Sequence, residues 1–211
     1  AITDRNSLSG VVRAHSAAKE SGLPVIIGAE LTPVDAPPIV AWAPHRLAYG
    51  DLSRLITTGR RRAEKGECLL YYADIAEASA DLLYGVLPFR RFDSLEAADL
   101  AELCRYREAL EERVSLLAPL HLGSDDEGAV RRYQALSRDS GLPLIASGDV
   151  RYHHAPRMVL HDIMTAIRNG TTVAQCADLL LPNAQHHLRE LRELSELYRD
   201  IPAALERTIW V

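Results

Sequence analysis

The sequence has few cysteines, no long apolar run and no excess of positive charge, and each absence excludes a class of protein. Its cysteines, Cys68, Cys104 and Cys176, lie far apart without a CxxC pair, which argues against a zinc ribbon and favours a reducing compartment. No run reaches the length of a membrane span and no signal peptide is visible, so we expect a cytoplasmic protein without a membrane partner. The net charge is −5, so the chain as a whole is not an electrostatic DNA binder.

Common nucleotide and hydrolase motifs are missing as well. The chain contains no GxGxxG, no P-loop and no GxSxG, so dinucleotide-binding, NTPase and hydrolase-elbow interpretations have no support. With 211 residues, 47% of them hydrophobic and 25% charged, the composition is that of an ordinary globule whose core needs no disulfides.

The sequence contains a motif that occurs twice and ends in a carboxylate residue each time. Residues 21–30 read SGLPVIIGAE and residues 140–149 read SGLPLIASGD. In each copy a Ser-Gly turn precedes a short apolar run, which is typical of a buried strand. The chain opens with a third version, AITD, which ends at Asp4. Because the carboxyl ends of parallel strands face the ligand site in α/β proteins, three acids there indicate a metal or a cationic partner.

Strand-like and helix-like patterns alternate along the chain, which predicts one α/β domain, a barrel or an open sheet, with a helical C-terminal extension. Further strands are predicted at residues 39–43, 69–72, 82–87 and 114–120. Helices are predicted after Asp51, with Leu52, Leu55 and Ile56 buried, over residues 95–113, and from Pro156, with Val159, Ile163, Ala166 and Ile167 directed inward.

The candidate site residues are acids and histidines at predicted strand ends: Asp4, Glu30, His121, Asp149, His153 and His154. Divalent ions take this mixture of carboxylate oxygen and imidazole nitrogen, and such ions polarise phosphoryl groups. The alternative is that the acids cap helices or pair with the neighbouring Arg5 and Arg151. His186 and His187 stand in a polar stretch, and we expect both at the surface.

A basic run, Arg60, Arg61, Arg62 and Lys65, ends the predicted helix that follows Asp51. Cations at a helix C-terminus interact favourably with the macrodipole, so a solvated helix end is one interpretation. A patch that contacts nucleic-acid phosphates is the other.

Several stretches carry a resemblance to a known family: AITD, SLSGVVRAH, IGAE, YGDLSRLIT, LPLIASGDV, DIMTAIR and LPNAQHHL. In this order they cover nearly the whole chain and resemble the N-terminal PHP (polymerase and histidinol phosphatase) domain of bacterial C-family DNA polymerases, the DNA polymerase III alpha subunits, most closely the error-prone branch. The resemblance implies an α/β fold, a distorted (β/α)₇ barrel with up to three metals at the strand C-ends. It also implies a PHP domain over residues 1–176 and a helical extension toward the polymerase body over residues 177–211.

Carried over residue by residue, the resemblance implies metal-ligand positions at Glu30, His121 and Asp149, while Asp4 matches the acid of the family's Thr-Asp-His motif. The histidine expected around the third strand is missing, where two prolines stand at 37–38. The family's opening His-x-His motif would precede residue 1, and we expect the chain to lack upstream sequence.

Two more of the family's histidines are replaced by Arg5 and Arg151. A guanidinium is always charged and cannot coordinate a cation. We therefore expect both arginines to pair with Asp4, Glu30 or Asp149 through bidentate hydrogen bonds, in place of a metal cluster.

The resemblance predicts a structural PHP domain of an error-prone DNA polymerase, with no resident metal and little or no phosphoesterase activity. Its expected partners are the polymerase body of the same parent chain, primed DNA through the parent, and other repair or replication proteins. The alternative is a metal-dependent PHP phosphoesterase or 3′-5′ exonuclease acting on DNA, nucleotides or small phosphate esters, with Mn, Zn or Mg held by Glu30, His121, Asp149 and His153. A third possibility is a module that binds another repair protein.

Overall fold

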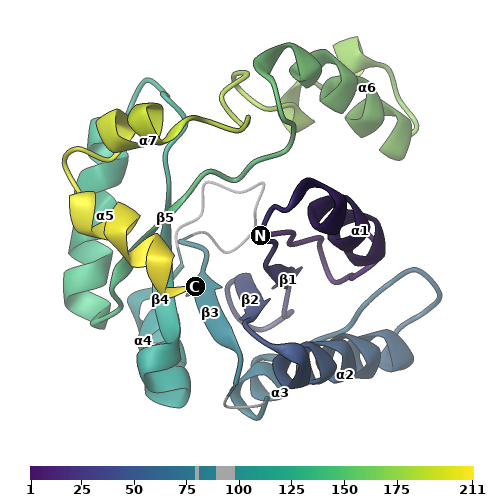
Figure 1. The fold of residues 1–211 in the computed structure, drawn as a ribbon, viewed down its shortest axis with the longest axis vertical. Coiled ribbons are helices and arrows are strands. Elements are labelled where there is room, and N and C mark those ends of the chain that lie inside the picture. The colour runs from purple at the N-terminus through teal and green to yellow at the C-terminus, as the bar shows by residue number, and fades with distance from the viewer. Residues whose placement is uncertain (79–80, 89–97) are drawn as a thin grey trace.

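A curved five-stranded sheet surrounded by helices forms the body of the molecule (Figure 1). The computed structural model describes residues 1–78, 81–88 and 98–211. The strands are β1 (Ile27–Leu31), β2 (Ile39–Ala43), β3 (Leu83–Val86), β4 (Val114–Pro119) and β5 (Leu144–Ser147), in that spatial order. β2 is antiparallel to β1 and β3, whereas β3, β4 and β5 run parallel.

The predicted α/β class is therefore confirmed, but the predicted closed barrel is not. No strand pairing joins β5 to β1 among the described residues, so the sheet is open and mixed. The reversal at β2 has a simple cause, since residues 32–38 are too few for the helical crossover that a parallel connection needs. Residues 2–5 continue the sheet beyond β1 through isolated parallel bridges from Ile2 to Ile27 and from Arg5 to Glu30.

The helices cover the outer side of the sheet and extend over one of its ends (Figure 1). The longer ones are α1 (Val11–Ser21), α2 (Arg46–Arg62), α4 (Leu100–Leu110), α5 (Asp126–Ser140) and α6 (Met158–Arg168). The shorter ones are α3 (Tyr72–Ala76), α7 (Leu191–Leu197) and α8 (Pro202–Glu206), with 3₁₀ turns η1 (Glu111–Arg113), η2 (Ala155–Arg157), η3 (Val173–Gln175), η4 (Ala177–Leu179) and η5 (Arg207–Trp210). None of the described helices is long and apolar enough to cross a bilayer.

The repeated Ser-Gly-Leu-Pro motif ends a helix and precedes a strand in both copies. Gly22 and Gly141 adopt left-handed φ values of 66° and 71° just past the ends of α1 and α5. In each case the glycine N–H returns to a carbonyl of the last helical turn, a C-cap for which glycine avoids the steric cost of a Cβ. The strands β1 and β5 then follow, and each leads to one of the acids singled out above.

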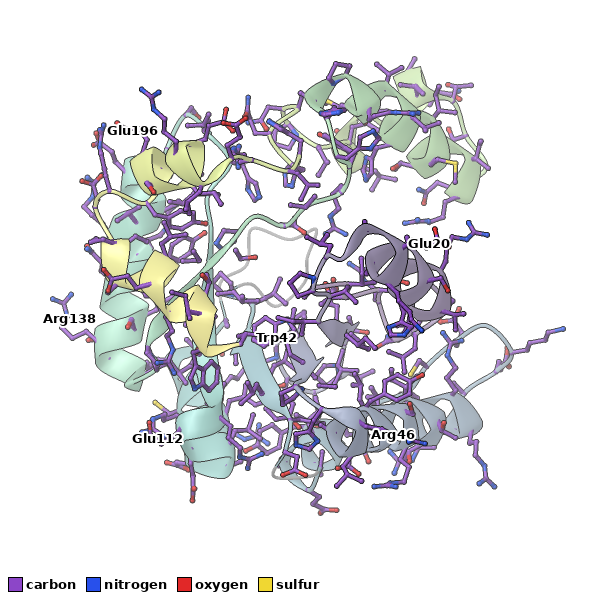
Figure 2. The ribbon with its side chains drawn as sticks, viewed as in Figure 1. Glu20, Trp42, Arg46, Glu112, Arg138 and Glu196 are labelled. Atoms are coloured by element: carbon purple, nitrogen blue, oxygen red, sulfur yellow. The ribbon has the colours of Figure 1, made fainter. Side chains whose placement is uncertain are left out.

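Alternation along the strands divides the core between the two faces of the sheet. Ile39 and Ala41 of β2 join the main cluster, which α2 completes with Leu52, Leu55 and Ile56, as predicted. Trp42 lies on the opposite face in a small cluster with Leu87, Leu117 and Ile145. In Figure 2, Trp42 lies in the interior, whereas Glu112, Arg138 and Glu196 point outward.

The segment after residue 176 packs onto the same sheet. Tyr198, Ile201 and Ala204 are buried in a cluster with Ala118 and Leu120 at the end of β4. The Tyr198 hydroxyl donates to the Ala118 carbonyl at 2.7 Å and accepts from the Ser147 amide at 3.2 Å. Burial raises the pKa of Tyr198 to about 12, so the hydroxyl keeps its proton at neutral pH. This segment is thus an integral part of the folded unit.

Three sequence predictions need correction or restriction. Residues 69–72 are not a strand: Leu70 makes one isolated bridge to Pro33, and α3 begins at Tyr72. The helix predicted over 95–113 is seen as α4 and η1, and its first residues, 95–97, lie outside the described residues. The helix predicted after Pro156 is α6, but of its four residues expected to point inward, Val159, Ile163, Ala166 and Ile167, only Ala166 is buried.

Candidate functional site

Three of the predicted acids and histidines gather where β1, β4 and β5 end. Glu30 lies in β1, His121 follows β4, and the loop after β5 carries Asp149. A fourth segment, residues 183–187, packs against these loops: the Asn183 side chain donates to the His121 carbonyl at 3.0 Å. The site is therefore built from segments that lie far apart in the sequence.

Glu30 is paired with Arg5 through both main chain and side chain. The Glu30 amide donates to the Asp4 carbonyl at 3.2 Å, and the Asn6 amide donates to the Glu30 carbonyl at 2.8 Å. This register places Arg5 Nε 2.9 Å from Glu30 Oε1. The Glu30 side chain is 8% exposed and that of Arg5 is 53% exposed. Arg5 thus contacts one of the expected acids, while the bidentate geometry stays a prediction.

Asp4 has a different role from the other two acids. Its Oδ2 atom accepts a hydrogen bond from the Gly10 amide at 3.1 Å, at the start of α1. A Cβ atom at Gly10 would lie only 2.7 Å from that oxygen, so a larger residue there would displace the Asp4 carboxylate. Asp4 therefore serves the N-terminus of a helix, which is the alternative that the sequence left open for these acids.

Asp149 is shared by a guanidinium and an imidazole. Its Oδ1 lies 2.9 Å from Arg151 Nη2, the second predicted arginine–acid pair. Its Oδ2 lies 3.2 Å from His186 Nδ1, which also donates to the Asp149 carbonyl at 3.1 Å. Asp149 itself has a positive φ of 38°, a conformation that costs energy in a non-glycine residue and that its partners must hold in place.

His186 is the site residue that sequence reasoning missed. It was expected at the surface, yet it is 5% exposed. The Arg151 and Tyr152 amides both donate to its carbonyl, and Tyr152 forms a bridge to His187. Because this pairing joins residues far apart in the chain, the local polar composition of 183–187 could not indicate it.

His121 lies face to face with His186, with ring centroids 3.8 Å apart and an angle of 24° between the rings. Burial, together with the neighbouring His186, lowers the pKa of His121 to about 4, so this imidazole is neutral at pH 7. Its Nε2 atom is buried without a hydrogen-bond partner among the described residues.

The two arginine–acid pairs belong to one electrostatic site. Burial raises the pKa of Glu30 above its ordinary value, and the nearby Asp149 carboxylate adds to this. Arg5 and Arg151 act in the opposite direction and favour the ionised form. Arg151 therefore acts on both acids, although it pairs directly with Asp149. Two guanidiniums balance two carboxylates at this end of the sheet.

One group of the described residues could hold a divalent ion. Ligand-capable atoms of His121, Asp149 and His186 lie within 4.8 Å of one another, the only such group of three within the described ranges. The neutral His121 with its unpartnered Nε2 fits an ion there. Glu30 lies outside this group and faces Arg5, which cannot coordinate a metal.

The remaining predicted residues lie elsewhere. His153 and His154 are exposed, with rings 4.7 Å apart, and line a groove with Leu188, Arg189, Glu190 and Glu193. The structure does not bring His153 into the group of potential ligands.

Two residues of the basic run at the end of α2 form contacts within the molecule. Arg60 donates to the Asn6 carbonyl at 2.9 Å and so supports the loop beside Arg5. Arg62 pairs with Asp74 at 2.6 Å. Arg61 and Lys65 are exposed, and no ion pair to either is found among the described residues. These contacts favour the structural interpretation of the run over a phosphate-binding one.

Relatives of the chain are bacterial proteins named error-prone DNA polymerase. It is 46% identical over 218 residues to that of Rhodopirellula baltica, a match that covers 100% of this chain and 19% of the relative. It is 43% identical over 200 residues to that of Pseudomonas syringae pv. syringae, covering 95% of this chain and 19% of the relative. The Brucella abortus protein is 39% identical over 213 residues, covering 98% of this chain and 20% of the relative.

The chain thus spans about one fifth of the length of the curated relatives that it matches. No protein-family model matches it. Among solved structures, it is similar to a proposed metal-dependent phosphoesterase from Bifidobacterium adolescentis, with 12% identity and a TM-score of 0.46, over 70% of this chain and 75% of the other.

Proposed function

We propose that this chain is the PHP domain of an error-prone DNA polymerase, since proteins of that name are similar to it along its whole length. In this proposal it acts as a structural domain with a degenerate metal site. Its residues 1–176 would form the PHP domain proper and residues 177–211 the helical extension toward the polymerase body. Through its parent it would take part in DNA replication and repair on primed DNA in the cytoplasm. The polymerase chemistry itself would belong to the rest of the parent chain.

One observation carries the proposal: both arginines, at positions where the resemblance implies histidines, bond to acids of the site. Arg5 reaches Glu30 and Arg151 reaches Asp149, each at 2.9 Å. A guanidinium that neutralises a carboxylate does what a coordinated cation would otherwise do for that charge. The paired acids therefore have no need of the ions that phosphoester hydrolysis requires. In this account the arginines preserve the fold of the site while removing its chemistry.

A hydrolysis assay tests the proposal directly. The chain is incubated in manganese with bis-p-nitrophenyl phosphate and with 3′-labelled primed DNA, alongside the Asp149→Ala variant. We expect turnover at background for both proteins. Robust turnover that Asp149→Ala abolishes, while the exposed-surface control Asp139→Ala keeps it, would refute the structural role.

The second candidate function is a metal-dependent phosphoesterase or 3′-5′ exonuclease that works with a single ion. The observation that favours it is the group of His121, Asp149 and His186, with the unpartnered Nε2 of His121. When bound, a Mn, Zn or Mg ion would supply a Lewis acid for a phosphoester. His121 and His186 would hold it through ring nitrogens, and Asp149 would have to share its carboxylate with Arg151. Hydrolysis in the assay above, lost on His186→Phe, would establish this function instead.

A further inference from the structure

The solvent-facing side of α6 is apolar, whereas the solvent-facing side of an ordinary surface helix is polar. Its large apolar side chains point to solvent: Val159, Leu160, Ile163, Met164 and Ile167 are between 43% and 67% exposed. Val159, Ile163 and Ile167 recur every four residues, with Leu160 and Met164 beside them, so the five form one continuous stripe. This sequence pattern predicted burial, and the described residues leave these side chains exposed.

The side of α6 that faces the rest of the chain is largely polar. His161 and Asp162 have side chains 28% and 16% exposed, and the ring of His161 meets Tyr152 at a centroid distance of 6.0 Å. Three polar atoms on this side, Tyr152 Oη, His161 Nδ1 and Asp162 Oδ1, are buried without hydrogen-bond partners among the described residues. No residue of α6 belongs to a described core cluster. The described residues therefore give α6 little apolar packing beyond the buried Ala166, and His161 Nδ1 and Asp162 Oδ1 meet only at 3.7 Å, so the helix is held weakly.

We propose that the apolar stripe of α6 packs against an apolar surface of the parent polymerase outside these residues. This inference rests on the proposed function. The matched stretch is only 19% of the length of the curated relatives, so they carry ample further chain to cover the helix. In Figure 1, α6 stands at the periphery, away from the sheet, where such a surface can reach it.

The size of the stripe favours a tethered partner over a second copy of the chain. An 11-residue helix is about 16 Å long and about 10 Å wide, so one face offers only a few hundred Å². A stable dimer of separate chains needs roughly 800 Å² on each partner. A covalently attached partner is present at an effective concentration of order millimolar, so a small apolar contact suffices.

Amide hydrogen exchange tests this packing, measured in the 211-residue chain and in the same chain within its intact parent polymerase. We expect α6 amides to exchange at least about tenfold more slowly in the intact polymerase, with α2 amides unchanged, because the partner suppresses local opening. Equal α6 exchange in both proteins would overturn the inference.

Two double variants identify the contact surface. Val159→Gln/Ile167→Gln removes the stripe, and Val12→Gln/Leu47→Gln removes equally exposed apolar side chains from α1 and α2. In the intact polymerase, only the α6 variant should restore fast exchange and lower the melting temperature by several degrees. Concentration-dependent dimerisation of the isolated chain, lost only in the α6 variant, would overturn the inference in favour of a second copy. Metal content and hydrolysis test the degenerate site separately, so failure of one does not imply failure of the other.

Discussion

Backbone hydrogen bonds place Arg5 beside Glu30, and this register lets their side chains form an ion pair. Main-chain hydrogen bonds on both sides of Arg5 fix its register against β1, and Arg5 Nε then lies 2.9 Å from Glu30 Oε1. Asn6 strengthens this register, because its side-chain oxygen accepts from the Thr32 amide at 3.1 Å. A nearly buried carboxylate thereby meets a cation whose side chain is half exposed. The Arg5–Glu30 pair is therefore positioned by the backbone of the fold.

The variant Arg5→Gln should therefore destabilise the chain by about 1–2 kcal/mol at pH 7, a value reduced for the exposure of Arg5. Without Arg5, the already raised pKa of Glu30 rises further. The native state then holds a proton that the unfolded state has released, so the loss grows as the pH rises above about 4.5. Urea unfolding at pH 4 and pH 7 measures this difference.

Arg13→Gln is the matched control, since Arg13 is an exposed residue of α1. It should change the free energy of unfolding by less than about 0.5 kcal/mol at either pH. An Arg5→Gln loss that is equal at pH 4 and pH 7 would contradict a charge-balancing role for Arg5.

Replacing both site arginines by histidine should increase metal binding. The double variant Arg5→His/Arg151→His removes two fixed charges and offers two imidazoles beside Glu30 and Asp149. We expect at least about a tenfold gain in Mn²⁺ or Zn²⁺ affinity by titration calorimetry. The double variant Arg5→Gln/Arg151→Gln removes the same charges without adding ligands and should gain much less. Equal gains in both would show that charge alone, rather than ligation, governs metal binding.

His186→Phe tests the residue that the sequence did not reveal. Phenylalanine keeps an aromatic ring against His121 but loses both hydrogen bonds to Asp149. We expect a loss of about 1–3 kcal/mol in the free energy of unfolding, since acceptors of Asp149 are left unpaired. His187→Phe, which removes one bond to the Ala184 carbonyl, should cost less. A larger effect at position 187 would mean that His186 does not organise the loop.

Tyr198→Phe tests whether the segment after residue 176 is part of the folding unit. The variant removes a hydroxyl that joins Ala118 of β4 to Ser147 of β5 and leaves those groups buried. We expect a loss of about 1–3 kcal/mol and a single unfolding transition. Tyr49→Phe is the control, because no hydrogen bond of its hydroxyl is found in the described part of the chain. A separate, early transition for α7 and α8 would contradict a single unit.

Local patterns predicted much of the framework. The strands β2 and β4 lie within about one residue of the predicted ranges, because each is a short apolar run bounded by turn residues. The acids at the ends of β1 and β5 were found for the same reason. The pairing of Arg5 and Arg151 with acids was predicted from the family resemblance, which implies histidines at these positions, together with the fixed charge of guanidinium.

Other features depend on long-range contacts that no local pattern encodes. His186 enters the site only because its carbonyl pairs with the loop after Asp149. The periodicity of α6 correctly indicated an apolar face, but it could not show that this face is exposed to solvent in the described structure. The antiparallel direction of β2 follows from the short connection of residues 32–38, which leaves no room for a helical crossover.

The most direct test of the account is the metal content of the chain. The protein is purified without chelator and dialysed against buffer that contains Mn²⁺ and Zn²⁺, each at about 10 µM. Its metal content is then measured by elemental mass spectrometry. Replacement of the metal cluster by Arg5 and Arg151 predicts fewer than two ions per chain, with Glu30→Gln leaving the content unchanged. Two or more ions per chain, lost on Glu30→Gln or Asp149→Asn, would contradict it.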